Sequence, residues 1–170
     1  MKLFIIIFFG ILNFTTCFAN GASWAQTDRL FFIERSKNKN LVQYDVRLLD
    51  NSDLPDSNPV IVYWVLENGQ KEELSPIQRK YVYGIESQEK LEKNRFSIFL
   101  AALKDRKIIV EKIDGFYKAI VFISGKPSVL EKVFVESKER LNGLPRVLYI
   151  DLIGRTKQTN LPIRERIIQN

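Results

Sequence analysis

The chain has 170 residues and a formal net charge of +6, and 45% of its residues are hydrophobic, which is enough to form a buried core. It contains no histidine and one cysteine, Cys17, so an intrachain disulfide, a Cys/His zinc site and a histidine general base are excluded. Catalysis by a Ser-His-Asp or Cys-His arrangement is excluded for the same reason. We predict no catalytic residue, no metal ion and no cofactor.

Residues 1–19 have the pattern of a secretory signal peptide. Lys2 supplies the positive charge, residues 3–12 form the apolar segment, and Cys17-Phe18-Ala19 is a small-x-small cleavage site. This apolar run is shorter than the roughly 20 residues that span a bilayer, so we predict no transmembrane segment after cleavage. The expected location is the periplasm or the outer envelope.

Residues 20–170 are predicted to form a single exported β domain. Their positive charge favours anionic partners, which for an exported protein are envelope lipids and acidic glycans, or a protein partner, rather than nucleic acid. Acylation of Cys17, as in a bacterial lipoprotein, is the less favoured alternative. The preceding Phe14-Thr15-Thr16 lacks the residues that lipoprotein signals prefer.

The first predicted elements are two strands that form a hairpin. Polar and apolar residues alternate over residues 41–48, and the strand at 29–36 is joined to it by the polar turn at 37–40. A symmetric register places Ile33 opposite Tyr44. The same register places Phe31 opposite Val46, so Arg35 lies on the apolar face beside the turn.

Turn signals rich in Asn, Asp, Gly and Pro separate the remaining strands. The signals are Asn68-Gly69, Asp114-Gly115, Gly125-Lys126-Pro127 and Asn142-Gly143. They bound strands predicted at 60–66, 96–103, 107–113, 116–123, 129–137 and 146–152, and the loop at 50–59 is rich in Asp, Asn, Ser and Pro. The Asp114-Gly115 hairpin places Glu111 opposite Lys118, a favourable cross-strand pair. The predicted fold is all-β with one short helix, an antiparallel meander of about eight strands forming a barrel or sandwich.

The one predicted helix covers residues 76–83. Ser75 is the expected N-cap, Pro76 occupies the first turn, and Gln78 completes a capping box. Gly84 follows the last turn and is expected to take the left-handed conformation that often ends a helix.

Several short motifs resemble catalytic signatures but carry little weight. Residues 36–39 and 87–90 both match Ser-x-x-Lys, yet Ser36 lies at a hairpin turn and no Lys-Thr-Gly element is present. Gly125-Lys126 lacks the other residues of a phosphate-binding loop. A pair of carboxylates for glycoside hydrolysis stays open, since the 20 acidic residues allow many pairs, although Glu72-Glu73 reads as a solvated turn.

Cations, amides and aromatic residues concentrate in three places and form a candidate binding surface. Aromatic rings and nearby cations can hold a sugar ring or an anionic headgroup. The alternative without a binding role is that Trp64 and Tyr81 belong to the core and that Arg79 and Lys80 form a solvent-exposed helix face. The candidate residues are Arg35, Lys37, Asn38, Asn40, Tyr63, Trp64, Gln78, Arg79, Lys80 and Tyr83.

The same segments resemble a known family. Residues 30–45, Pro59-Val60 with Tyr63-Trp64, and residues 73–84 are similar to small exported bacterial proteins grouped as domain of unknown function 4833. The resemblance extends from about Leu30 to the end of the chain, and its most specific parts are residues 35–40 and 78–84. It implies one exported domain and supplies no catalytic residue.

Function is therefore unknown from the sequence, and three hypotheses follow. The leading one is a non-catalytic exported protein that binds an anionic or glycan envelope ligand at the candidate surface. The second is a carboxylate-dependent hydrolase of envelope glycans. The third is a structural envelope subunit that presents a sheet edge to a partner.

Overall fold

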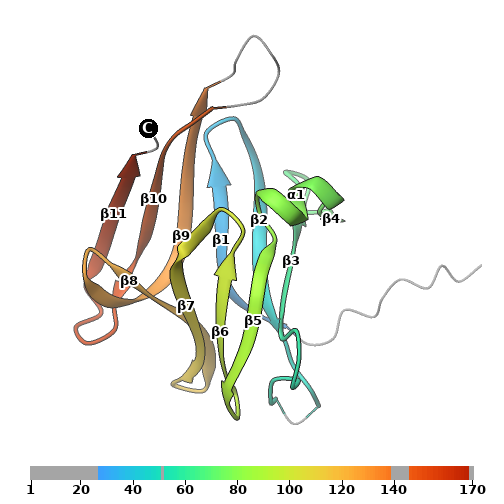
Figure 1. Ribbon diagram of the computed structural model, residues 1–170, viewed down its shortest axis with the longest axis vertical. Coiled ribbons are helices and arrows are strands. Elements are labelled where there is room, and N and C mark those ends of the chain that lie inside the picture. The colour runs from blue at the N-terminus through green and yellow to red at the C-terminus, as the bar shows by residue number, and fades with distance from the viewer. Residues whose placement is uncertain (1–26, 51, 139–145, 169–170) are drawn as a thin grey trace, which may run out of the picture.

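A computed structural model describes residues 27–50, 52–138 and 146–168 of the protein, which are almost entirely β-structure (Figure 1). The predicted signal peptide and the predicted Asn142-Gly143 turn lie outside these residues. The only helix within them is α1 (Pro76–Tyr81). The strands are β1 (Thr27–Arg35), β2 (Asn38–Arg47), β3 (Val60–Val65), β4 (Lys71–Glu73), β5 (Ile85–Glu92), β6 (Arg95–Leu100), β7 (Leu103–Ile113), β8 (Phe116–Ile123), β9 (Lys126–Lys138), β10 (Arg146–Thr156) and β11 (Pro162–Ile168).

These strands form one sheet that curls into a half-barrel. The hydrogen-bonded order is β4-β3-β2-β1-β9-β8-β7-β6-β5, and β10 pairs with both β9 and β11. The sheet branches at β9, whose residues 126–129 pair with β8 and whose residues 132–135 pair with β1. Because β9 serves both halves, the sheet folds back on itself around a shared interior (Figure 1).

The prediction of a purely antiparallel meander is wrong at one pair. β1 and β9 run parallel, with Ile33 beside Val133 and Arg35 beside Val135. The Lys132 ammonium and the Glu34 carboxylate bridge the same pair at 2.9 Å. A turn signal specifies only neighbouring antiparallel strands, so this pairing of residues about a hundred positions apart had no local signature.

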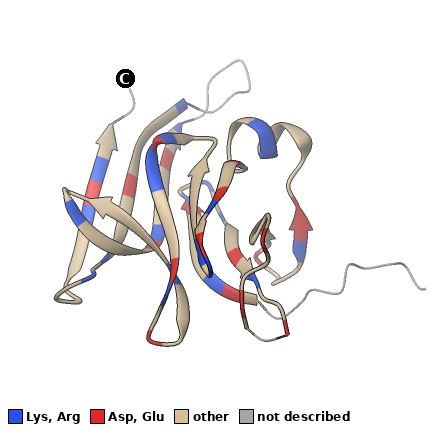
Figure 2. Ribbon diagram, turned by 60° about the horizontal axis from the view of Figure 1, so that its bottom comes forward, with Lys and Arg blue, Asp and Glu red and all other residues tan. Residues whose placement is uncertain are grey.

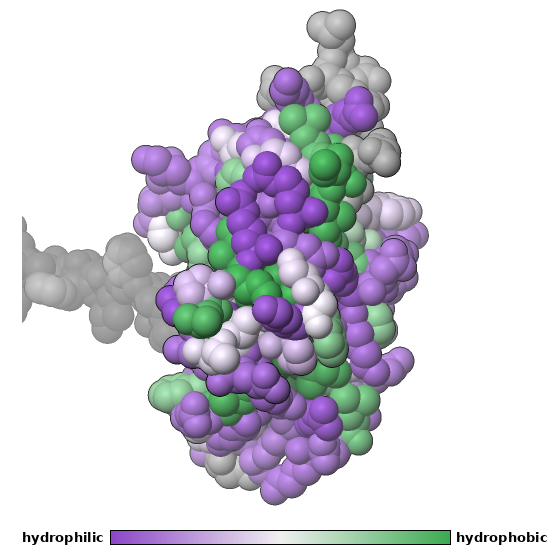
Figure 3. Space-filling view, turned by 90° about the vertical axis from the view of Figure 1, so that its left-hand side faces the viewer, coloured by the Kyte–Doolittle hydropathy of each residue, from purple (hydrophilic) through white to green (hydrophobic). Residues whose placement is uncertain are grey.

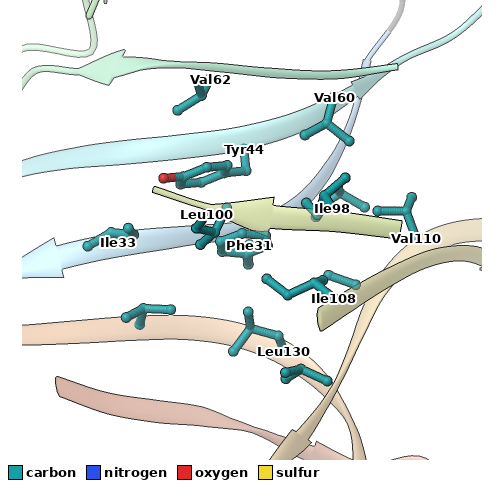
Figure 4. Packing of buried hydrophobic residues seen from close by; sticks show 14 of the residues in the cluster. Phe31, Ile33, Tyr44, Val60, Val62, Ile98, Leu100, Ile108, Val110 and Leu130 are labelled. Carbon is teal, nitrogen blue, oxygen red and sulfur yellow. The ribbon is translucent and has the colours of Figure 1, made fainter. Parts of the chain in front are cut away.

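The core lies between the two halves of the sheet. Phe31 and Tyr44 stack with their ring centroids 4.4 Å apart, and both are fully buried. Figure 4 shows them facing Ile98 and Leu100 of β6 and Ile108 of β7. Each such side chain contributes about 1.5–3 kcal/mol when it leaves water, so the alternating apolar residues account for the folding of both halves.

The first hairpin forms with a different register from the predicted one. Phe31 lies opposite Tyr44, and Ile33 lies opposite Val42. The turn is confined to residues 36–37, so β2 begins at Asn38 within the predicted loop. Two register shifts in β1, one of them just before Arg35, are local bulges that a symmetric register cannot anticipate.

Most of the other predicted strands are present. β8 has the predicted bounds, Glu111 lies opposite Lys118, and Asp114 and Gly115 both have positive φ, as a two-residue hairpin requires. The strands β4, β5 and β11 were not predicted, and they bring the total to eleven within the described residues. β5 and β11 are rich in charged residues, so neither has the apolar alternation that marks a half-buried strand.

A side chain closes the seam between the two halves. The Gln88 amide of β5 donates to the Val60 carbonyl at 3.1 Å and accepts from the Val60 backbone N–H at 3.0 Å. These two bonds replace a strand pairing between β3 and β5, and they satisfy backbone groups at the edge of β3.

The helix begins as predicted and ends earlier. The Ser75 hydroxyl accepts from the Gln78 N–H, and the Gln78 side chain accepts from the Ser75 N–H, which together form a capping box. The helix ends at Tyr81, not at residue 83. Gly84 does not have the predicted positive φ, and it is needed because a Cβ there would lie 1.6 Å from the Arg79 carbonyl oxygen.

Loss of the N-cap gives the first testable prediction. Ser75→Ala removes the bond to the Gln78 N–H and is expected to lower the free energy of unfolding by about 1 kcal/mol. Urea denaturation followed by circular dichroism measures this difference. Ser57→Ala, at an exposed loop position, is the matched control and should change stability little. Equal effects of both variants would contradict the role of the cap.

Candidate functional site

Five of the residues that the sequence singled out meet at one end of the half-barrel, and they are Arg35, Asn38, Trp64, Gln78 and Tyr83. There α1 lies near β4 and the end of β3, on the side of the β1–β2 hairpin (Figure 1). Three contacts fix this arrangement. The Trp64 indole N–H donates to the Gln78 side chain at 3.1 Å, the Tyr44 hydroxyl donates to the Tyr83 carbonyl at 2.5 Å, and the Trp64 and Tyr83 rings meet edge to face at 5.2 Å.

Arg35 is the centre of this cluster. Its guanidinium carbon lies 4.6 Å from the Trp64 ring centroid and 6.0 Å from that of Tyr83. Its Nη2 donates to the Asn38 side-chain oxygen at 3.0 Å, and its Nη1 donates weakly to the Tyr83 hydroxyl at 3.4 Å. The cation is therefore held by ring faces and by neutral oxygens.

The charge of Arg35 is not balanced by a nearby carboxylate. Among the residues that the structure describes, Arg35 has no ion-pair partner, and its buried Nε has no hydrogen-bond acceptor. The two acidic residues that line the same hollow as Arg35 are already occupied, because Glu34 pairs with Lys132 and Glu67 pairs with Lys39 at 3.1 Å. A partly buried cation that no carboxylate neutralises is favourable ground for an anion.

The Tyr44 hydroxyl beneath the cluster is uncharged. The Tyr44 ring is fully buried, and this burial raises the pKa of its hydroxyl well above the usual value. Tyr44 therefore stays protonated and keeps donating to the Tyr83 carbonyl. This bond fixes the backbone that carries the Tyr83 ring against Trp64.

An open hollow of about 820 Å³ borders Arg35 on the hairpin side. It is lined by three basic and two acidic residues together with amide, hydroxyl and apolar groups. Its lining is Glu34, Arg35, Ser36, Lys37, Asn38, Lys39, Leu41, Glu67 and Phe134. Asn40 lies beside it and accepts from the Glu67 N–H at 3.1 Å, which ties the hairpin to the β3–β4 turn.

The remaining two basic candidates lie outside the Arg35 cluster. Arg79 pairs with Glu73 at 3.2 Å, and the Lys80 ammonium lies 5.1 Å from the Tyr81 ring centroid. Both are exposed on α1, whose basic segment is blue in Figure 2. Tyr81 is 62% exposed, so the alternative that placed it in the core is wrong for this residue.

Tyr63 and Trp64 are separated by the sheet. Neighbouring residues of a strand point to opposite faces, so only Trp64 reaches the Arg35 cluster, where it is 7% exposed. Tyr63 lies on the other face, and its hydroxyl donates to the buried Asp45 at 2.5 Å. Desolvation and this carboxylate raise the Tyr63 pKa. The two rings cannot hold the same ligand.

The catalytic motifs find no support in the geometry. The Ser36 hydroxyl accepts from the Ser137 N–H at 3.3 Å, which is a structural role. Ser87 and Lys90 lie three residues apart on β5, and so do not share a face. Within the described ranges, no group of three acidic residues is arranged to hold a metal ion.

The carboxyl groups with displaced pKa values are all more acidic than usual. A hydrogen bond from Asn94 lowers the pKa of Asp53, and hydrogen bonds led by that from Arg166 lower the pKa of Asp151. Burial raises the pKa of Glu165, but bonds from the Ser124 N–H and Arg106 outweigh it and lower the net value.

Comparison with known proteins gives one match. The family model described as Domain of unknown function (DUF4833) matches residues 31–166, which is most of the chain. The chain belongs to this family. Searches of curated proteins and of solved structures found no match. The predicted family is thus confirmed, and the match contains both the Arg35 cluster and the hollow.

Two residues that position Tyr83 were not singled out by the sequence. Tyr44 donates to the Tyr83 carbonyl from 39 residues away in the chain. Gly84 is required because of the Arg79 carbonyl oxygen, which approaches it only when α1 has formed. Neither contact leaves a pattern in the local sequence. No helix in the described part of the chain has the length and hydrophobicity to cross a membrane.

Proposed function

We propose that this protein is a non-catalytic, exported binding protein that holds an anionic envelope ligand at Arg35. The observation that carries this proposal is the Arg35 guanidinium, which lies over the Trp64 ring, has a buried Nε without an acceptor and forms no ion pair among the described residues. A phosphate or carboxylate beside this guanidinium would be attracted by its charge and would receive charge-assisted hydrogen bonds from it. Lys37 and Lys39 in the hollow would add attraction at longer range.

The chemistry of the cluster favours an anion over an uncharged glycan. A sugar ring needs an open aromatic face, but Trp64 and Tyr63 are both buried. Arg35 already occupies the face of Trp64. The signal peptide and the envelope location belong to the proposal, and they rest on the pattern of residues 1–19.

The structural-subunit hypothesis gains less support. The terminal strand β5 carries alternating charges, with Glu89, Lys90 and Glu92 among its exposed residues, and β4 has only three residues. Short and charged edge strands are features that oppose pairing with another sheet.

The test measures binding at Arg35. Arg35→Ala is expected to weaken co-sedimentation with phosphatidylglycerol vesicles about tenfold at physiological salt, where non-specific attraction is largely screened. Arg35→Lys keeps the charge but loses the planar stacking on Trp64, and should give an intermediate loss. Lys126→Ala removes an equal charge at the β8–β9 turn and should leave binding unchanged.

Two further arms make the result decisive. Phosphatidylcholine vesicles test the need for negative charge, and glycerol phosphate in competition tests whether the headgroup alone is recognised. Thermal unfolding of each variant separates lost binding from lost folding. If Arg35→Ala binds the vesicles as well as the unaltered protein does, the proposed function is wrong. It is also wrong if Arg35→Ala loses no more binding than Lys126→Ala does.

A further inference from the structure

An apolar strip begins beside Arg35 and runs across the inner face of the half-barrel. In the sheet, Arg35 lies next to Val135, Val135 lies opposite Ile150, and Ile150 lies opposite Ile167. Residues that are paired in this way point to the same face. Three strand spacings of about 4.8 Å make the strip about 14 Å long.

Much of this strip is only partly covered. Ile150 is buried, but Val135 and Ile167 pack against the core while keeping part of their surface in contact with solvent. Val147 of β10 lies opposite Ser137, two residues from Val135, and widens the strip with the same intermediate exposure. Leu103, at the start of β7, has the same intermediate exposure. Partly exposed hydrophobic residues that face the interior of a curled sheet are typical of the mouth of a ligand-binding barrel.

The opposite wall is fixed by an ion pair. Arg106 of β7 pairs with Glu165 of β11, and Glu165 also accepts from the Ser124 N–H. Ile167 follows Glu165 by two residues on the same face, and Leu103 precedes Arg106. Figure 1 shows the end of β11, the end of β1 and the β6–β7 turn at the same end of the half-barrel.

The surface on this side is amphipathic. Figure 3 looks onto the side where β11 lies and shows hydrophobic surface, in green, directly beside strongly hydrophilic surface. The strip itself has the Arg35 cation at one end and apolar groups along its length. This is the chemistry that matches an anionic headgroup joined to an alkyl chain.

We propose that the ligand held at Arg35 is an anionic amphiphile whose alkyl chain lies along Val135, Val147 and Ile167. This inference rests on the proposed function, because it takes the headgroup to be bound at Arg35. It adds that affinity grows with chain length, since each methylene group placed on the strip leaves water.

Alkyl phosphates below their micelle concentrations test the inference. In a Trp24→Phe background, Trp64 is the sole tryptophan and its fluorescence reports events beside Arg35. Dodecyl phosphate is expected to bind at least about tenfold more tightly than butyl phosphate, because even two or three buried methylene groups suffice for that difference. Dodecyl maltoside, which has the same chain and no charge, should bind more weakly than dodecyl phosphate.

Two adjacent isoleucines supply a matched pair of variants. Ile167→Ser should weaken dodecyl phosphate about tenfold and leave butyl phosphate unchanged, since it removes apolar surface from the strip. Ile168→Ser, at a 71% exposed position on the other face of β11, should alter neither affinity. Leu103→Ser replaces Ile167→Ser if the latter is poorly folded. The comparison of butyl with dodecyl phosphate requires neither variant.

The outcomes distinguish this inference from the proposed function. Equal affinity for butyl and dodecyl phosphate, with both lost in Arg35→Ala, would overturn the amphiphile and leave the anion site in place. Chain-length dependence that is unaffected by Arg35→Ala and by Ile167→Ser would place the alkyl chain elsewhere and overturn the inference. Absence of binding by either phosphate would overturn the proposed function as well.

Discussion

Gly84→Ala is expected to lower the free energy of unfolding by about 3 kcal/mol and to disrupt the Arg35 cluster. A Cβ at this position would lie 1.6 Å from the Arg79 carbonyl oxygen and 2.6 Å from its carbonyl carbon. Both atoms belong to the backbone of α1, so the clash cannot be relieved by a side-chain rotation. The chain must move between α1 and β5, and Tyr83 moves with it.

The measurement combines urea denaturation with the fluorescence of Trp64 in the Trp24→Phe background. Gly69→Ala is the matched control, because its Cβ would meet no atom within 4 Å, although its φ of +82° makes the substitution mildly strained. That strain should cost about 1 kcal/mol and leave Trp64 undisturbed. Similar losses in the two variants would mean that the close approach at Gly84 is unimportant.

Asp151→Ala is expected to lower the free energy of unfolding by a comparable amount, about 3 kcal/mol. Asp151 is fully buried on the outer face of β10, where it receives hydrogen bonds from Arg164 and Arg166 of β11. The Arg166 guanidinium also stacks on Tyr149, 3.7 Å from the ring centroid. Removing the carboxylate leaves two cations side by side and loosens the terminal strand.

The size of this effect follows from the exposure of the partners. The Arg164 and Arg166 side chains are about half exposed and are hydrated again when Asp151 is removed. The decrease in the free energy of unfolding is therefore at the lower end of the range for breaking a buried ion pair. Asp56→Ala is the control, because Asp56 forms a surface pair with Lys90 and should contribute less than about 0.5 kcal/mol. A loss no larger than that of the control would show that β11 does not depend on Asp151.

Acid titration checks the same pair. The hydrogen bond from Arg166, with that from Arg164, lowers the pKa of Asp151 from 3.8 to about 2. A carboxyl group with a lowered pKa in the folded state stabilises the protein above the unfolded value and loses this contribution as pH falls. The stability difference between the unaltered protein and Asp151→Asn should therefore be constant above about pH 4 and shrink toward pH 2. A difference that grows on acidification would contradict the ion pair.

Local features of this protein could be predicted because their determinants are adjacent in the chain. The capping box of α1 needs only Ser75 and Gln78, and the β7–β8 hairpin needs only Asp114-Gly115 between two alternating segments. The placement of Arg35 on the apolar side of its hairpin follows from period-two alternation, even though the exact register was wrong.

The tertiary structure alone decided how these elements assemble into a site. The parallel contact of β1 with β9 places Arg35 beside Val135, a hundred residues away, and no turn or periodicity encodes that neighbour. Packing of α1 against β3 selects Trp64 and Gln78 for the cluster and leaves Arg79 paired with Glu73 at the surface. Sequence patterns record which face of an element is apolar, whereas the unpaired charge of Arg35 depends on which distant carboxylates the fold brings near and which it has already joined to lysines.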